Sequence, residues 1–150
     1  MKTAKLINTL EDALKASLNA QIEVEAEDYG KAVAGVAEFS QGFEDPMRLA
    51  KYNTCLICPD QVRLERAQQL CRISVDLILA IKASGKPAVM DVMKVYADAV
   101  GNLVEADPTL GGNAFEVRFE SAEFVGPTPA NGLVGVVIAR LSVDADDLLQ

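Results

Sequence analysis

The segment "NTCLICPD" (residues 53–60) holds two of the three cysteines of this 150-residue chain, Cys55 and Cys58, in a C-x-x-C arrangement. Thiols at this spacing form redox centres or half of a zinc site. A redox centre places its first cysteine at a helix N-terminus, where the helix dipole lowers the thiol pKa. The residues around this pair are instead typical of a β-strand, on which side chains three positions apart point to opposite faces. We therefore predict small buried apolar side chains, and keep a thiol redox or metal-binding module using Cys55 and Cys58 as the alternative.

The rest of the chain offers few groups that could complete an active site. A structural zinc site needs four ligands, and Cys71 is the one remaining thiol, on the apolar face of another predicted strand. The chain has no histidine, which removes Ser-His-Asp and Cys-His catalysis and every imidazole metal site. The acidic groups at 23–28 and 144–147 do not match a calcium-binding loop. The sequence predicts no catalytic, cofactor-binding or metal-binding residue, and hence a protein that is not an enzyme.

The charge and hydropathy of the chain limit the classes of partner that we expect for it. It carries 14 Lys and Arg against 22 Asp and Glu, a net charge of −8. Nucleic-acid binding needs clustered basic residues, and the densest group, Arg63, Arg66 and Arg72, is interleaved with Glu65. We expect no signal peptide, because the N-terminus is amphipathic, and no membrane partner, because the longest apolar run is far short of about 20 residues. An odd number of cysteines favours a reducing compartment.

The spacing of apolar residues predicts the elements of the first half of the chain. Leucines at three- and four-residue spacing predict a helix over residues 4–18, and alternating residues predict a half-exposed strand over 20–26. Residues 28–51 fit helix or strand. Residues 52–58 read as a strand that Pro59 and Asp60 end. The polar residues 61–70 fit a hairpin connection or an extension of both flanking strands.

The second half has clearer patterns. We predict a strand over 71–82, the main helix over 88–105, a strand over 114–125, a loop over 126–132 and a central strand over 133–143. Residues 143–150 are acidic and predicted to be a flexible tail. The predicted order is α-β-β-β-α-β-β, which indicates an α+β fold. We expect an antiparallel or mixed sheet of about four to five strands packed with two main helices, in a single domain over residues 1–150.

The succession of motifs over residues 52–143 resembles a known family. The strand "CLICPD", the main helix, the stretch "EADPTLGGNAFEVRFESAEFV" and the strand "GLVGVVIARLSV" follow one another in that order. This order is similar to that of the tail terminator or tail-completion proteins of long-tailed bacteriophages, the minor tail protein U type. The N-terminal helix matches more loosely.

The resemblance implies a structural virion protein without a cofactor, assembled in the cytoplasm of the host bacterium. Its partners would be copies of itself in a homohexameric ring, the tail tube protein and the head-completion or neck proteins. The ring would cap the head-proximal end of the tail tube, stop its polymerisation and join the tail to the head. DNA would pass through without specific binding, which an acidic surface favours. The alternatives in the same setting are a head–tail adaptor and a tail tube protein.

Subunit contacts are expected from two segments that a sheet would hold in place. One is the hairpin around residues 59–72, and the other is the loop 126–132. The candidate interface residues are Pro59, Asp60, Arg63, Glu65, Arg66, Pro127, Pro129 and Asn131.

Overall fold

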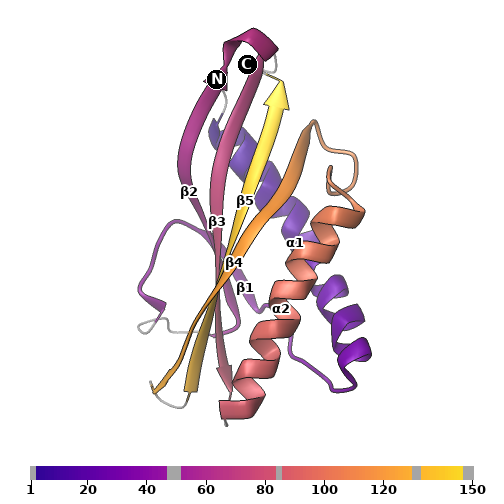
Figure 1. The fold of residues 1–150 in the computed structure, drawn as a ribbon, viewed down its shortest axis with the longest axis vertical. Helices are drawn as coiled ribbons and strands as arrows, with labels where there is room; N and C mark the ends of the chain where they lie inside the picture. Colours follow the sequence, from indigo (N-terminus) through magenta and orange to yellow (C-terminus); the bar gives the residue numbers. More distant parts are fainter. Residues whose placement is uncertain (1–2, 47–51, 84–85, 130–132, 147–150) are drawn as a thin grey trace.

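The computed structural model describes residues 3–46, 52–83, 86–129 and 133–146, and Figure 1 shows their arrangement. The five strands form one mixed sheet in the order β1-β2-β3-β5-β4, in which β1 and β2 are parallel and the other neighbours antiparallel. The predicted α+β class is confirmed. The elements are α1 (Thr3–Tyr29), β1 (Glu38–Gln41), β2 (Thr54–Glu65), the short 3-10 helix η2 (Arg66–Gln68), β3 (Leu70–Ala83), α2 (Lys86–Ala106), β4 (Phe115–Pro129) and β5 (Leu133–Asp146).

Helix α1 is longer than predicted, and the strand predicted over residues 20–26 is wrong. Those residues continue α1 to Tyr29. Ile22 and Ala26 are buried and extend the four-residue spacing of the apolar stripe, whereas Val24 is half exposed. Alternation over a few residues and a helical stripe can share the same apolar positions, and here packing against the core selects the helix. The stripe consists of Ile7, Leu10, Leu14, Leu18, Ile22 and Ala26.

The main hydrophobic core lies between the sheet and the two helices, which both cover the same face (Figure 1). The central strand β3 sends alternate residues into this core, as its sequence pattern predicts. Helix α2 confirms the helix predicted over 88–105, with one or two more residues at each end. It packs closely over β5, because a Cβ atom built at Gly135 would lie 2.9 Å from Cγ of Met93. The buried β3 residues are Cys71, Ile73, Val75, Leu77, Leu79 and Ile81.

The opposite face of the sheet carries a smaller apolar cluster and a group of ion pairs. Leu56, Ile78, Val134 and Val136 form the cluster. Further along the same strands, the side chains on the face without helices are Arg and Asp, which form ion pairs. This face is therefore apolar at one end of the sheet and charged at the other.

Three boundaries predicted from the sequence are wrong. Strand β2 does not end at Pro59 and Asp60 but continues to Glu65, with an irregularity between Pro59 and Gln61. Sheets tolerate proline at a bulge or a free edge, and β1 pairs with β2 only up to Ile57. Of the two readings of residues 61–70, each holds in part: residues 61–65 extend β2 and Leu70 begins β3, while η2 between them is the hairpin connection.

The two C-terminal strands, β4 and β5, both end later in the sequence than predicted. Residues 126–129 belong to β4 rather than to a loop, past a second irregularity in its pairing with β5. Residues 143–146, predicted to be tail, complete β5, where Ala145 is buried and Asp144 accepts hydrogen bonds from Arg72. Residues 130–132 and 147–150, the rest of the predicted loop and tail, lie outside the described residues.

Candidate functional site

The two cysteines of the C-x-x-C segment lie on opposite faces of β2, as strand periodicity predicts. Cys55 is fully buried in the core under the helices, and Cys58 is half-buried beside the cluster on the other face. Burial raises the pKa of both thiols, and the charge of Asp76 raises that of Cys58 further. Cys71 is buried near the far end of the hairpin, opposite Leu64. Raised pKa values and separated sulfurs oppose the thiolate that redox or metal chemistry needs.

Potential metal ligands do not gather elsewhere in the described part of the chain. None of its clusters brings three or more Asp, Glu or Cys side chains together in a way that could hold a metal ion. Two exposed surfaces of the described residues are the candidate functional regions.

The first surface is the hairpin of β2 and β3, which reaches past the helices at one end of the molecule (Figure 1). Arg63 and Arg66 are exposed, and neither makes an ion pair with any other described residue. Leu64 between them is 37% exposed. We call Arg63, Leu64 and Arg66 the hairpin tip. Leu64 pairs with the core residue Cys71 and emerges on the helix side of the hairpin, whereas Arg63 pairs with Arg72 and emerges on the other side. An exposed apolar side chain next to uncompensated cations is typical of a contact surface.

The remaining predicted interface residues are spread along the sheet. Glu65 is half-buried within the tip, between Leu64 and Arg66, and Asp60 lies 4.0 Å from Arg140 on the uncovered face. Pro127 and Pro129 lie at the opposite end of the sheet from the tip. The 14 residues of β3 span the distance between these two ends. That length corresponds to about 40 Å at the rise of a strand. Asn131 lies outside the described residues. The structure thus separates the two predicted contact segments.

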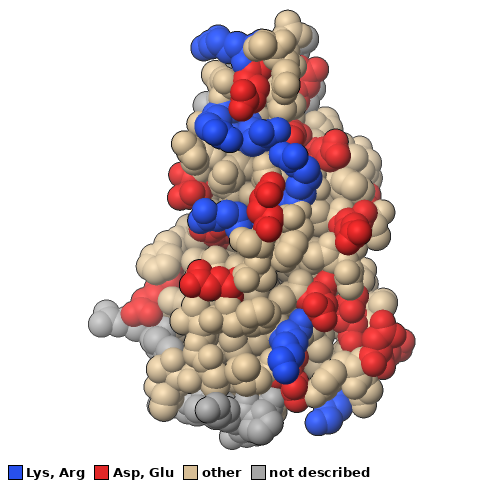
Figure 2. Space-filling model, in the orientation of Figure 1, with Lys and Arg blue, Asp and Glu red and all other residues tan. Residues whose placement is uncertain are grey.

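The arginines on the uncovered face differ from those of the tip because each has a partner. Arg72 binds Asp144 through two hydrogen bonds of 2.8 and 3.1 Å, and Arg118 approaches the same carboxylate at 3.4 Å. Arg140 binds Asp76 through two bonds of 2.9 and 3.1 Å. Figure 2 shows basic and acidic side chains interspersed over the upper half of this view. These arginines are neutralised within the subunit, whereas Glu116 and Glu123 on the same face are exposed and make no ion pair with a described residue.

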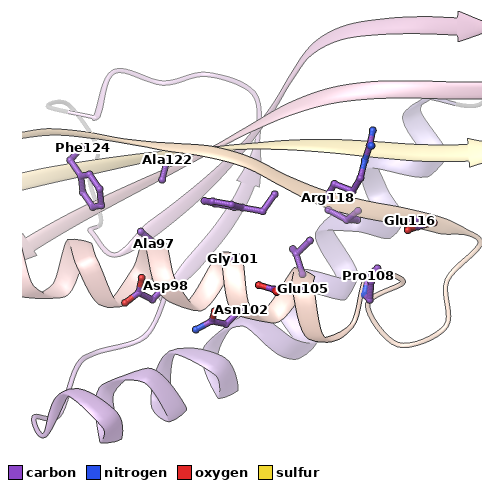
Figure 3. A pocket seen from close by; sticks show the side chains of 13 residues that line it. Ala97, Asp98, Gly101, Asn102, Glu105, Pro108, Glu116, Arg118, Ala122 and Phe124 are labelled. Carbon is purple, nitrogen blue, oxygen red and sulfur yellow. The ribbon is translucent and has the colours of Figure 1, made fainter.

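The second surface is a groove between α2 and the edge strand β4, with a volume of about 670 Å³. Its floor is apolar: Phe119 and Phe124 are 37% and 48% exposed, and the ring of Phe119 lies over Gly101 of α2. In Figure 3 the Phe124 side chain points from β4 toward the helix, while Arg118 points away from it. The lining comprises Ala97, Asp98, Gly101, Asn102, Val104, Glu105, Pro108, Glu116, Val117, Arg118, Phe119, Ala122 and Phe124.

The rim of this groove is acidic. Asp98 and Glu105 on α2 are both exposed, and within the described ranges neither makes an ion pair. Glu116 of β4 alternates with the core residues Phe115 and Val117, so it emerges with Arg118 on the uncovered face. We call this surface, with Phe119 and Phe124 as its floor, the acidic groove. It pairs exposed aromatic rings with free carboxylates.

Sequence reasoning did not find the acidic groove because its floor depends on a bulge. Strict alternation would send Phe119 and Phe124, five positions apart, to opposite faces. The pairing of β4 with β5 shifts between Phe119 and Ser121, and this extra residue returns both rings to the helix-facing side. Gly101 inside a helical pattern was the one available signal of a close approach.

Comparison with known proteins gives this chain no relatives: no family model matches it, and no curated protein is significantly similar to it. Of the helices in the described residues, none has the length and apolar character that a membrane span requires. The fold and surfaces define an α+β protein with two unlike exposed surfaces near opposite edges of its sheet.

Proposed function

We propose that this protein is a structural subunit that assembles into a closed ring, and that the ring is a bacteriophage tail terminator. It caps the head-proximal end of the tail tube, stops tube polymerisation and joins the tail to the head-completion proteins. The proposal rests first on the resemblance of residues 52–143 to that family. A homohexamer is the stoichiometry that the resemblance implies.

One structural observation supports ring assembly in particular. The hairpin tip carries unpaired cations beside one edge of the sheet, and the acidic groove carries unpaired carboxylates at the other edge. A ring requires a head-to-tail contact between two different surfaces of the same subunit, whereas a two-fold dimer uses one surface twice. Two unlike, complementary surfaces on opposite sides suit the first arrangement.

The chemistry of the chain supports a structural role over the thiol alternative. The pKa values of Cys55 and Cys58 are raised by burial, the reverse of what a reactive thiol needs. The net charge of −8 also disfavours binding of the DNA that would pass through the ring.

Imaging and mass measurement of the purified protein test the proposal. We expect a single closed ring by negative-stain electron microscopy, with a mass near six subunits by light scattering. The ring should also stop elongation when added to polymerising tail tube protein. Long filaments would instead favour a tail tube protein, and a ring that leaves tube elongation unchanged would favour a head–tail adaptor. A monomer at high concentration would reject ring assembly.

A further inference from the structure

We propose that the acidic groove receives the hairpin tip of a neighbouring copy of this chain. The inference rests on the proposed function, because it names the contact through which the ring closes. It assigns the two surfaces to each other: Arg63 and Arg66 of one subunit face Asp98 and Glu105 of the next, and Leu64 packs on the exposed aromatic floor.

The charges on the two surfaces are complementary and otherwise unused. Within the described residues, no ion pair is made by Arg63 or Arg66 of the tip, or by Asp98 or Glu105 of the groove rim. Arg118 of β4 is bound to Asp144 on the uncovered face. Arg118 therefore does not neutralise the groove rim from within. Complementary charges at a rim orient partners and speed association.

The apolar parts of the two surfaces also match. Leu64 lies on the helix side of the hairpin, because it pairs with the core residue Cys71, yet it remains 37% exposed. Phe119 and Phe124 leave apolar surface open in the groove. Aromatic residues and arginine dominate the binding energy of protein interfaces. Docking would remove all three exposed side chains from water.

The position of the surfaces fits a repeated side-by-side contact. β4 is one edge of the sheet, and β2 is next to the opposite edge. Beyond Ile57, β2 has no described neighbour on its outer side. A tip on one side and a groove on the other let each subunit give and receive one contact, as a ring requires.

The features of β4 favour side-chain docking over addition of a strand to its free edge. Its pairing with β5 is interrupted twice, and Pro127 and Pro129 lie among its last residues. Bulges and prolines are the devices by which edge strands resist pairing with another strand. The acidic rim likewise disfavours nucleic acid, whose phosphates would meet carboxylates.

Charge reversal tests the contact directly. Arg63→Glu with Arg66→Glu puts acidic residues on the tip, and Asp98→Lys with Glu105→Lys puts basic residues on the groove. Each pair alone should weaken assembly by about tenfold or more in sedimentation velocity. Combining all four substitutions in one chain restores opposite charges and should restore the ring. Because all four sites are exposed, circular dichroism and thermal unfolding should match the wild type.

A matched control separates the contact from net charge. Lys31→Glu with Lys82→Glu makes the same charge change as the tip reversal on exposed residues that belong to neither surface, and should leave the ring intact. Rings that persist in both reversed pairs, or that stay lost in the fourfold variant, would overturn the inference while leaving the proposed function standing. Intact rings that no longer cap tubes would assign the tip to the tail tube protein instead. A monomeric wild type would overturn the inference and the proposed function together.

Discussion

The side-chain amide of Asn19 on α1 binds both backbone polar groups of Val36. The Val36 N–H donates to Oδ1 over 2.7 Å, and Nδ2 donates to the Val36 carbonyl over 2.9 Å. Nearby, the Tyr96 hydroxyl of α2 donates to the carbonyl of Ala34 over 2.7 Å. The irregular segment between α1 and β1 is therefore held by one side chain from each helix. This arrangement satisfies backbone groups that no strand neighbour pairs.

Replacing Asn19 should destabilise the fold. Asn19→Ala leaves the N–H and carbonyl of the buried Val36 without their partner, and a buried polar group without a hydrogen bond costs about 1–3 kcal/mol. We expect urea denaturation to give a free energy of unfolding lower by that amount.

The matched control makes the same chemical change on the same helix. Asn8 is exposed, and its side chain bonds that of Gln41 at the surface. Asn8→Ala should therefore change stability by less than about 0.5 kcal/mol, as most surface substitutions do. Equal stability of the two variants would contradict the role of Asn19.

Two glycines should respond in opposite directions to the same added methyl group. At Gly135 the new Cβ meets Met93 and Val89 of α2, the latter at 3.3 Å, so Gly135→Ala should destabilise by about 1–3 kcal/mol. At Gly101 the nearest atom is Cδ1 of Phe119 at 3.8 Å, an ordinary contact. Gly101→Ala should instead stabilise by about 1 kcal/mol through helix propensity. Chemical denaturation of both variants checks the pair, and a shared sign would show that α2 does not pack as described.

The thiols should react slowly in the native protein. Burial raises the pKa of Cys55 and Cys58, so at pH 8 less of each is thiolate than in an unfolded chain. We expect an aromatic disulfide reagent to modify the half-buried Cys58 slowly, and Cys55 and Cys71 only after unfolding in guanidinium. A fast-reacting thiol in the folded protein would revive the redox alternative. The double variant Cys55→Ser with Cys58→Ser should still form rings, and it should lose only a little stability from altered packing.

The sequence predicted the elements whose patterns depend on local contacts alone. Strand β3 and helix α2 have a single apolar period over their whole length, so their faces could be assigned residue by residue. The end of α1 could not be predicted in this way, because the position of Ile22 fits both the helical and the strand period. Only packing against the tertiary core decides between the two. The same limit hid the acidic groove, since a bulge after Phe119 sets the side on which Phe124 emerges. Arg63 and Arg66 of the hairpin tip were named from the sequence and Leu64 was not, and Pro59 and Asp60 misplaced the start of the hairpin, because β2 passes an irregularity there and continues to Glu65.

Truncating Phe124 should separate assembly from stability. Phe124 is 48% exposed in the subunit, so Phe124→Ser removes about half of the buried surface of a core phenylalanine and should lower the free energy of unfolding by about 1–2 kcal/mol. In the assembled ring the same aromatic carbons would pack against Leu64 of the next copy, so the dissociation constant of the assembly should rise about tenfold or more. Phe43→Ser is the matched control: Phe43 is 72% exposed and lies away from both surfaces, between β1 and β2. Sedimentation velocity on the two variants checks the prediction. An equal effect of both substitutions on assembly would mean that nonspecific apolar surface, and not the acidic groove, holds the copies together.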